Sequence, residues 1–220
     1  MKNKMIEIER IKEKVFTNLK ENPIETNEIV YKVVDTTTIR AFHYKKDYQN
    51  HQPLSIYRVW AYDKLNEENS LIFNCKNFED IHTFYCNSFK SFWLEKEEIS
   101  LPIYKVNKIV DLFFKGVTLW KNISYERRKF FLENVHCPLD YFSLKYLKQK
   151  STSLSNEIKD GVTMKFIENV EQYNRYQKEI KNISNEMGIT PYIFDEIAWQ
   201  IGHNENGIKE PPKLIDVKRK

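Results

Sequence analysis

Apolar residues recur at helical spacing along most of the chain. Near the N-terminus the pattern predicts a helix over residues 5–20, whose single apolar stripe is formed by Ile8, Ile11, Val15 and Leu19. The same periodicity, with caps and prolines at the expected ends, predicts further helices over residues 53–65, 77–93, 102–120, 141–150, 162–187 and 190–202. The chain is therefore predicted to be mostly α-helical.

One segment lacks this helical periodicity of apolar residues. Within residues 28–48, the runs 29–34 and 36–39 are rich in Val, Ile and Thr, which favour strands because their branched side chains suit a pleated surface. A short strand or an irregular connection therefore competes with a helix here, and these alternatives stay open. A polar stretch of Ser, Thr and Asn at 151–156 predicts a linker between two helices.

Length and composition are typical of a single globular domain. The chain has 220 residues, of which 41% are apolar, and this suffices for a sizeable core. Its charges are well mixed and sum to +4, which permits nucleic-acid binding without demonstrating it. The N-terminal residues lack the apolar region of a signal peptide, and no apolar run is long enough to cross a bilayer. We therefore expect no membrane association.

The cysteines favour a reducing compartment. The chain has three of them, Cys75, Cys86 and Cys137, and none belongs to a Cys-x-x-Cys pair. An odd number without that spacing supports neither a disulfide framework nor a zinc knuckle. We therefore expect a cytoplasmic protein without a metal ion or another cofactor.

Two sequence motifs carry candidate chemistry. Lys108 opens an apolar stretch of a predicted helix, and Asp140 follows in the turn Pro-Leu-Asp about thirty residues later. In the last predicted helix, Asp195 precedes Trp199 by four residues, which puts both on one helix face. Taken singly, such a lysine is most often solvated and such an aspartate most often caps a helix.

In this order and spacing, the motifs resemble the catalytic stretch of archaeal oxoguanine DNA glycosylases of the helix-hairpin-helix superfamily. A similar helical group contains phage-defence glycosylases, which excise glucosylated hydroxymethylcytosine. The resemblance covers the C-terminal half and implies a helical bundle with its active site in a cleft between two helical halves. It implies one domain over residues 1–220, with an N-terminal half (1–100), catalytic and base-recognition helices (101–202) and a basic tail (203–220).

The resemblance also implies roles for individual residues. Lys108 would attack the sugar of a nucleotide flipped out of double-stranded DNA, and Asp140 would be its partner carboxylate. Asp195, Trp199 and Leu112 would hold the modified base, and the protein would act as a monomer. An amine attacks only after losing its proton, so we expect burial and a neighbouring Lys105 or Lys115 to disfavour the ammonium form of Lys108.

The sequence departs from the superfamily pattern at one point. No Gly-x-Gly hairpin precedes Asp140, and the backbone amides that would grip a phosphate there are missing from the motif. The basic residues that could replace them as DNA contacts are Arg127, Arg128, Lys129 and Lys145. The alternative is that these side chains are simply solvated at a helix surface.

Three other classes of function compete with base excision. The main alternative is a non-catalytic, DNA-binding helical protein. A ribonuclease using an Arg-x4-His pair is disfavoured because no arginine has a histidine five positions later. A metal-dependent nuclease is disfavoured because the carboxylates show no obvious ligand cluster in the sequence. The neighbours His136 and Cys137 are expected to be packed rather than reactive, since no further ligands stand beside them.

Overall fold

The structure is a computed structural model, and it describes residues 2–35, 38, 53–68 and 70–205. Within these ranges the protein is mostly helical, as predicted, and it contains no β-strand. Its helices are α1 (Lys2–Glu21), α2 (Thr26–Glu28), the π-helix η1 (Ile29–Val33), α4 (Pro53–Asn66), α5 (Leu71–Asn74), α6 (Phe78–Glu97), α7 (Ile103–Thr118), α8 (Tyr125–Asn134), α9 (Tyr141–Lys150), the 3-10 helix η4 (Met164–Phe166), α10 (Val170–Glu186) and α11 (Pro191–Glu205).

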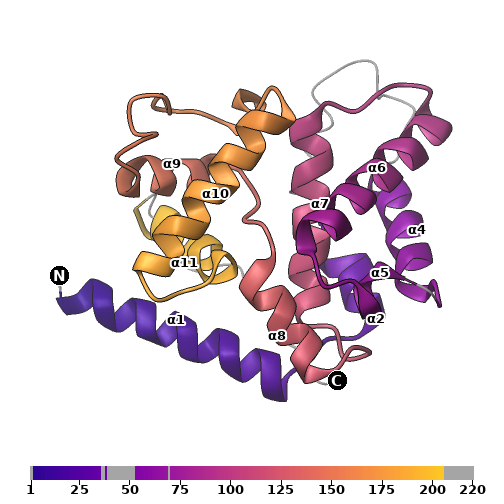
Figure 1. The fold of residues 1–220 in the computed structure, drawn as a ribbon, viewed down its shortest axis with the longest axis horizontal. Helices are drawn as coiled ribbons and strands as arrows, with labels where there is room; N and C mark the ends of the chain where they lie inside the picture. The colour runs from indigo at the N-terminus through magenta and orange to yellow at the C-terminus, as the bar shows by residue number, and fades with distance from the viewer. Residues whose placement is uncertain (1, 36–37, 39–52, 69, 206–220) are drawn as a thin grey trace.

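The helices gather in two groups (Figure 1). Helices α4, α6 and α7 form one group, and α9, α10 and α11 form the other. Helix α8 and the extended segment 135–140 run between them, while α1 lies along the edge against α8 and α11. Because segment 135–140 leads directly into α9, it carries Asp140 to the boundary between the two groups.

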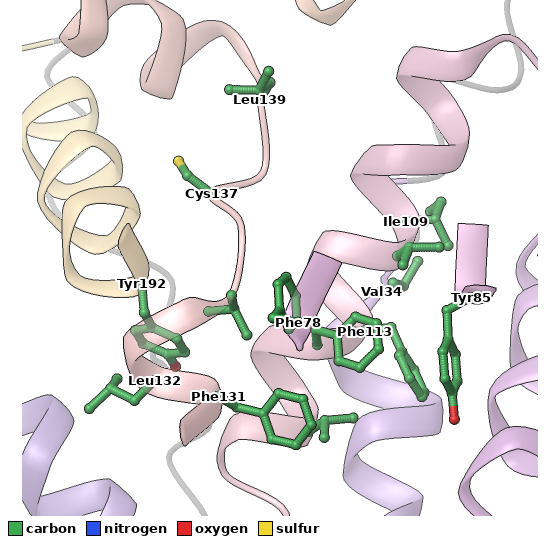
Figure 2. Packing of buried hydrophobic residues seen from close by; sticks show 14 of the residues in the cluster. Val34, Phe78, Tyr85, Ile109, Phe113, Phe131, Leu132, Cys137, Leu139 and Tyr192 are labelled. Atoms are coloured by element: carbon green, nitrogen blue, oxygen red, sulfur yellow. The ribbon is translucent and has the colours of Figure 1, made fainter. Parts of the chain in front are cut away.

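A dense aromatic core surrounds α7. The ring centroid of Trp60 lies 4.9 Å from that of Phe89 and 5.0 Å from that of Phe113. Figure 2 shows Phe78, Phe113 and Phe131 in the same layer, with Cys137 and Leu139 on the segment that follows α8. Burying one such ring contributes roughly 2–3 kcal/mol, so these contacts fix α7 firmly against α4, α6 and α8.

Local signals at the helix ends explain why the predicted boundaries hold. The side chain of Asn77 accepts a hydrogen bond from the backbone of Glu79 and starts α6, as the sequence predicted. Gly188 adopts φ +64° after α10, a conformation that favours glycine. Gly202 allows a close approach of α11 to α9, because a Cβ there would lie 2.1 Å from the ring of Phe142. The 162–187 helix is shorter than predicted, since its first part forms η4 and a loop.

The sequence left the structure of segment 28–48 open. The beginning of this segment is described by the structure and is helical. Its β-branched residues form η1 up to Val33, and the backbone becomes extended at Val34. Burial outweighs strand propensity here, because Ile29 and Val30 are enclosed by the core and the carbonyl of Ile29 accepts a hydrogen bond from Tyr57. Most of the remaining segment lies outside the described residues, as does the predicted basic tail beyond Glu205.

Among the described residues, none of the helices combines the length and the apolar character needed to span a bilayer.

Candidate functional site

Helix α7 carries polar groups into the interior between the two helix groups. Lys105, Asn107 and Asp111 are buried, and Lys108 and Lys115 are mostly covered. A buried charge is costly unless it is paired, so each of these side chains calls for a partner from a neighbouring element. The partners of Lys108, Asp111 and Lys115 define three polar clusters along the helix.

Lys108 meets the carboxylate that the sequence assigned to it. Its ammonium Nζ lies 3.3 Å from Asp140 Oδ2, and the two side chains are 18% and 21% exposed. The other oxygen, Asp140 Oδ1, caps α9 by accepting hydrogen bonds from the backbone of Phe142 (2.9 Å) and Ser143 (3.1 Å). Asp140 therefore acts as a helix cap with one oxygen and faces the lysine with the other.

The hollow beside Lys108 is small. It is lined by Tyr104, Asn107, Asp111, Leu139, Ile167 and Tyr173, and it leaves no room for a water molecule. Ile167 is the residue that follows η4. A base or a sugar enters this hollow only if its lining moves.

Lys115 lies two turns further along α7 and is held by two carboxylates. It donates to Asp195 and, at 2.8 Å, to Glu196 of α11. Burial alone lowers the pKa of Lys115, but the two negative charges outweigh it and hold that pKa well above its ordinary value. Burial raises the pKa of Asp195 to about 6 against the opposing charge of Lys115. Lys115 therefore stays an ammonium ion.

The three residues predicted to hold the base have different neighbours in the structure. Asp195 is buried, and its two oxygens face Lys115 and, at 3.6 Å, the Sγ of Cys137. Trp199 is half-buried and stacks on His203 with 3.4 Å between the ring centroids. Its indole also contacts Phe142 at the start of α9, next to Asp140. Leu112 is half-buried at the edge of the core.

Arg127 and Arg128 of α8, which were predicted to contact DNA, donate hydrogen bonds to backbone carbonyls of the protein. Arg128 is only 8% exposed and donates to the carbonyls of Trp120 and Ile123. The guanidinium group of Arg127 donates hydrogen bonds to the carbonyls of Ile72 and Leu71. Lys129 is exposed and lies 3.8 Å from Glu133, and Lys145 on α9 is half-buried. The hydrogen bonds of the two arginines tie α8 to α5 and to the loop before α8, and they bury the guanidinium of Arg128.

A third polar cluster was not anticipated from the sequence. His82 Nε2 lies 2.9 Å from Asp111 Oδ1, and the hydroxyl of Tyr173 donates to that same oxygen at 2.7 Å. His136 faces this hydroxyl with Nδ1 at 3.1 Å and faces Glu79 with Nε2 at 3.0 Å. One ligand atom each from His82, Asp111 and His136 lie within 4.8 Å of one another. No spacing of carboxylates along the sequence had indicated this group, because it combines one carboxylate with two histidines.

Charge within this cluster follows from burial. Burial, and then the neighbouring His82, lowers the pKa of His136, so its ring is neutral near pH 7. The hydrogen bond from His136 lowers the pKa of Glu79, which is therefore ionised. Burial and the charge of Asp111 raise the pKa of the Tyr173 hydroxyl.

A cleft of about 570 Å³ opens over this cluster between α6, α7 and α10. His82, His136 and Tyr173 lie at its wall, and Asn107 and Tyr173 separate it from the hollow beside Lys108. Its polar lining includes five side-chain amides, namely Asn87, Asn107, Asn134, Asn174 and Gln177. Three exposed lysines, Lys90, Lys178 and Lys181, lie around it.

Comparison with known proteins gives no match, because no family model, no curated protein and no solved structure is significantly similar to the chain.

Proposed function

We propose that this protein is a DNA glycosylase in which Lys108 is the nucleophile and Asp140 its partner. The observation that carries the proposal is the 3.3 Å contact between Lys108 Nζ and Asp140 Oδ2, made across 32 residues of sequence. The sequence resemblance to glycosylases implies roles for these two residues, which come from different elements of the structure. Their contact gives that pairing a geometry in which a proton can pass from amine to carboxylate.

Lys108 first gives one proton to Asp140. The neutral amine then attacks the anomeric carbon, the bond between sugar and base breaks, and the base leaves with the proton that Asp140 held, which restores the carboxylate. As the sugar ring opens, one of the two protons on the lysine nitrogen passes to the ring oxygen, and a protonated Schiff base remains on Lys108. The carboxylate of Asp140 stabilises the positive charge that develops on the sugar, where a fixed charge contributes most. A base-catalysed elimination can then cut the strand.

The cleft supports a large modified base as the substrate. Its volume of about 570 Å³ is within the range of sites that enclose whole small molecules. An amide-rich wall offers donors and acceptors both to a base edge and to the hydroxyl groups of a sugar. These features favour glucosylated hydroxymethylcytosine over oxoguanine. The sugar would reach Lys108 when the wall formed by Asn107, Tyr173 and Ile167 shifts.

The lysines around the cleft are the better candidates for phosphate contacts. Lys90, Lys178 and Lys181 are exposed, and none of them forms a direct salt bridge among the described residues, although the charge of Lys181 acts on Glu79. Replacing Lys178 and Lys181 with alanine should weaken DNA binding and flatten its salt dependence, because each phosphate contact adds about 0.9 to the slope. As a matched control, Lys96 and Lys121, which pair with Glu95 and Glu25, should be replaceable without this change.

Mass spectrometry of released bases tests the activity. Duplexes containing unmodified bases, oxoguanine or glucosylated hydroxymethylcytosine are incubated with the protein and with Lys108→Ala. We expect free base from one modified duplex only, and none with Lys108→Ala. Lys121→Ala, which removes an exposed lysine that pairs with Glu25 and not with a site residue, is the control. Binding to DNA without release of any base would instead support the non-catalytic alternative.

A further inference from the structure

The cluster of His82, Asp111 and His136 has the composition of a metal site. Two imidazoles and one carboxylate are contributed by α6, α7 and the segment after α8, all of them buried. Imidazole and carboxylate ligands together suit divalent transition metals such as Zn²⁺. We propose that His82, Asp111 and His136 bind a divalent transition-metal ion, and we take Zn²⁺ as the probe.

An unsatisfied atom at the centre points to a missing cation. Asp111 is 1% exposed, and its Oδ2 has no hydrogen-bond partner. A buried carboxylate oxygen without a hydrogen-bond partner destabilises the fold. A metal ion bound to this oxygen removes that destabilisation.

The contacts of His136 also suit a metal ligand. Its Nε2 lies 3.0 Å from Glu79, and its Nδ1 faces the cluster, 3.1 Å from the hydroxyl of Tyr173.

The surroundings also fit a metal. A histidine that binds metal through one nitrogen commonly donates the other to a carboxylate, as His136 does to Glu79. Two ligands on a tetrahedral zinc ion lie about 3.4 Å apart, given bonds of about 2.1 Å. Because the three ligand atoms already lie within 4.8 Å of one another, small side-chain rotations bring them onto one ion. The cleft leaves room for a water molecule as a further ligand.

Such an ion would connect the elements that carry the catalytic pair. Asp111 follows Lys108 by one turn of α7, and His136 precedes Asp140 by four residues. Binding would therefore fasten the segment 135–140 to α7. The site itself does not depend on the glycosylase proposal, because its ligands and its test involve no DNA.

Zinc titration of the metal-stripped full chain tests the proposal. A competing chromophoric chelator gives the affinity, and elemental analysis gives the stoichiometry. We expect one Zn²⁺ per chain, at least a hundredfold weaker binding with Asp111→Asn, and a 10–100-fold loss with Glu79→Gln. His203→Asn alters a buried histidine on α11 outside the cluster and should bind as the unaltered chain does.

A second measurement guards against misfolding. Glu79 is largely exposed on its side chain, so Glu79→Gln should fold even if Asp111→Asn does not, and circular dichroism checks both. Zn²⁺ should raise the melting temperature of the unaltered chain and of His203→Asn by the same amount. The proposal is overturned if no stoichiometric Zn²⁺ binds, or if folded Glu79→Gln binds it as tightly as His203→Asn does.

Discussion

Two lysines on α7, Lys108 and Lys115, lie seven residues apart on one face of the helix, yet their surroundings differ. Lys108 faces one carboxylate, Asp140, which also caps α9. Lys115 is held between two carboxylates of α11, and their charges hold its pKa well above the ordinary value. A lysine between two carboxylates is a fixed cation that joins helices. Lys108 has a single carboxylate partner, and in the proposed mechanism that carboxylate takes its proton.

Removing Lys115 should have the largest effect, on stability. Lys115→Met leaves the buried Asp195 and the mostly covered Glu196 without their cation, and breaking a buried pair from one side costs roughly 3–5 kcal/mol. Lys108→Met breaks a more exposed pair and should cost about 1 kcal/mol. Urea unfolding of both variants measures the two costs. Equal losses would contradict the assignment of different roles to the two lysines.

Substituting Asp140 should affect the rate rather than the fold. Asp140→Asn keeps the capping oxygen but replaces the oxygen that faces Lys108 with an amide group. We expect base release in a single turnover to slow at least tenfold and up to about a hundredfold, with the melting temperature unchanged. Asp140→Ser also caps a helix and lacks the second oxygen, so it should behave alike. A wild-type rate in both variants would leave Asp140 as a cap only.

The pH dependence of stability should single out Asp195. Because burial raises its pKa to about 6, the folded protein holds this proton more tightly than the unfolded chain does. The folded state thus binds more protons between pH 4 and pH 6, and the unfolding free energy falls as the pH rises through that window. Relative to Asp195→Asn, the loss should be about 3 kcal/mol. A difference between the two proteins that stays constant with pH would contradict the raised pKa.

The helices could be predicted from the sequence because periodicity and caps act locally. Asn77 starts α6 and Gly188 follows α10 through contacts within a few residues. The closeness of Lys108 and Asp140 was expected only because a family resemblance paired them. Their roles stay predictions.

What the sequence missed depends on tertiary packing. His82, Asp111, His136 and Tyr173 come from four separate elements, and no spacing along the chain brings them together. Arg128 was expected to contact DNA, but packing turns it inward to backbone carbonyls. The residues around a basic residue on a short helix do not indicate which face of that helix will be buried. The amide-lined cleft likewise appears only when α6 and α10 face each other.

Borohydride trapping tests the central claim most directly. The protein is incubated with DNA containing the modified base that it releases, the Schiff base is reduced, and the adduct is located by peptide mass spectrometry. We expect the sugar on Lys108, and no covalent complex with Lys108→Ala. Lys115→Met should still be trapped under conditions in which it is folded. An adduct on Lys105 or Lys115, or undiminished trapping in Lys108→Ala, would contradict the role of Lys108 as the nucleophile.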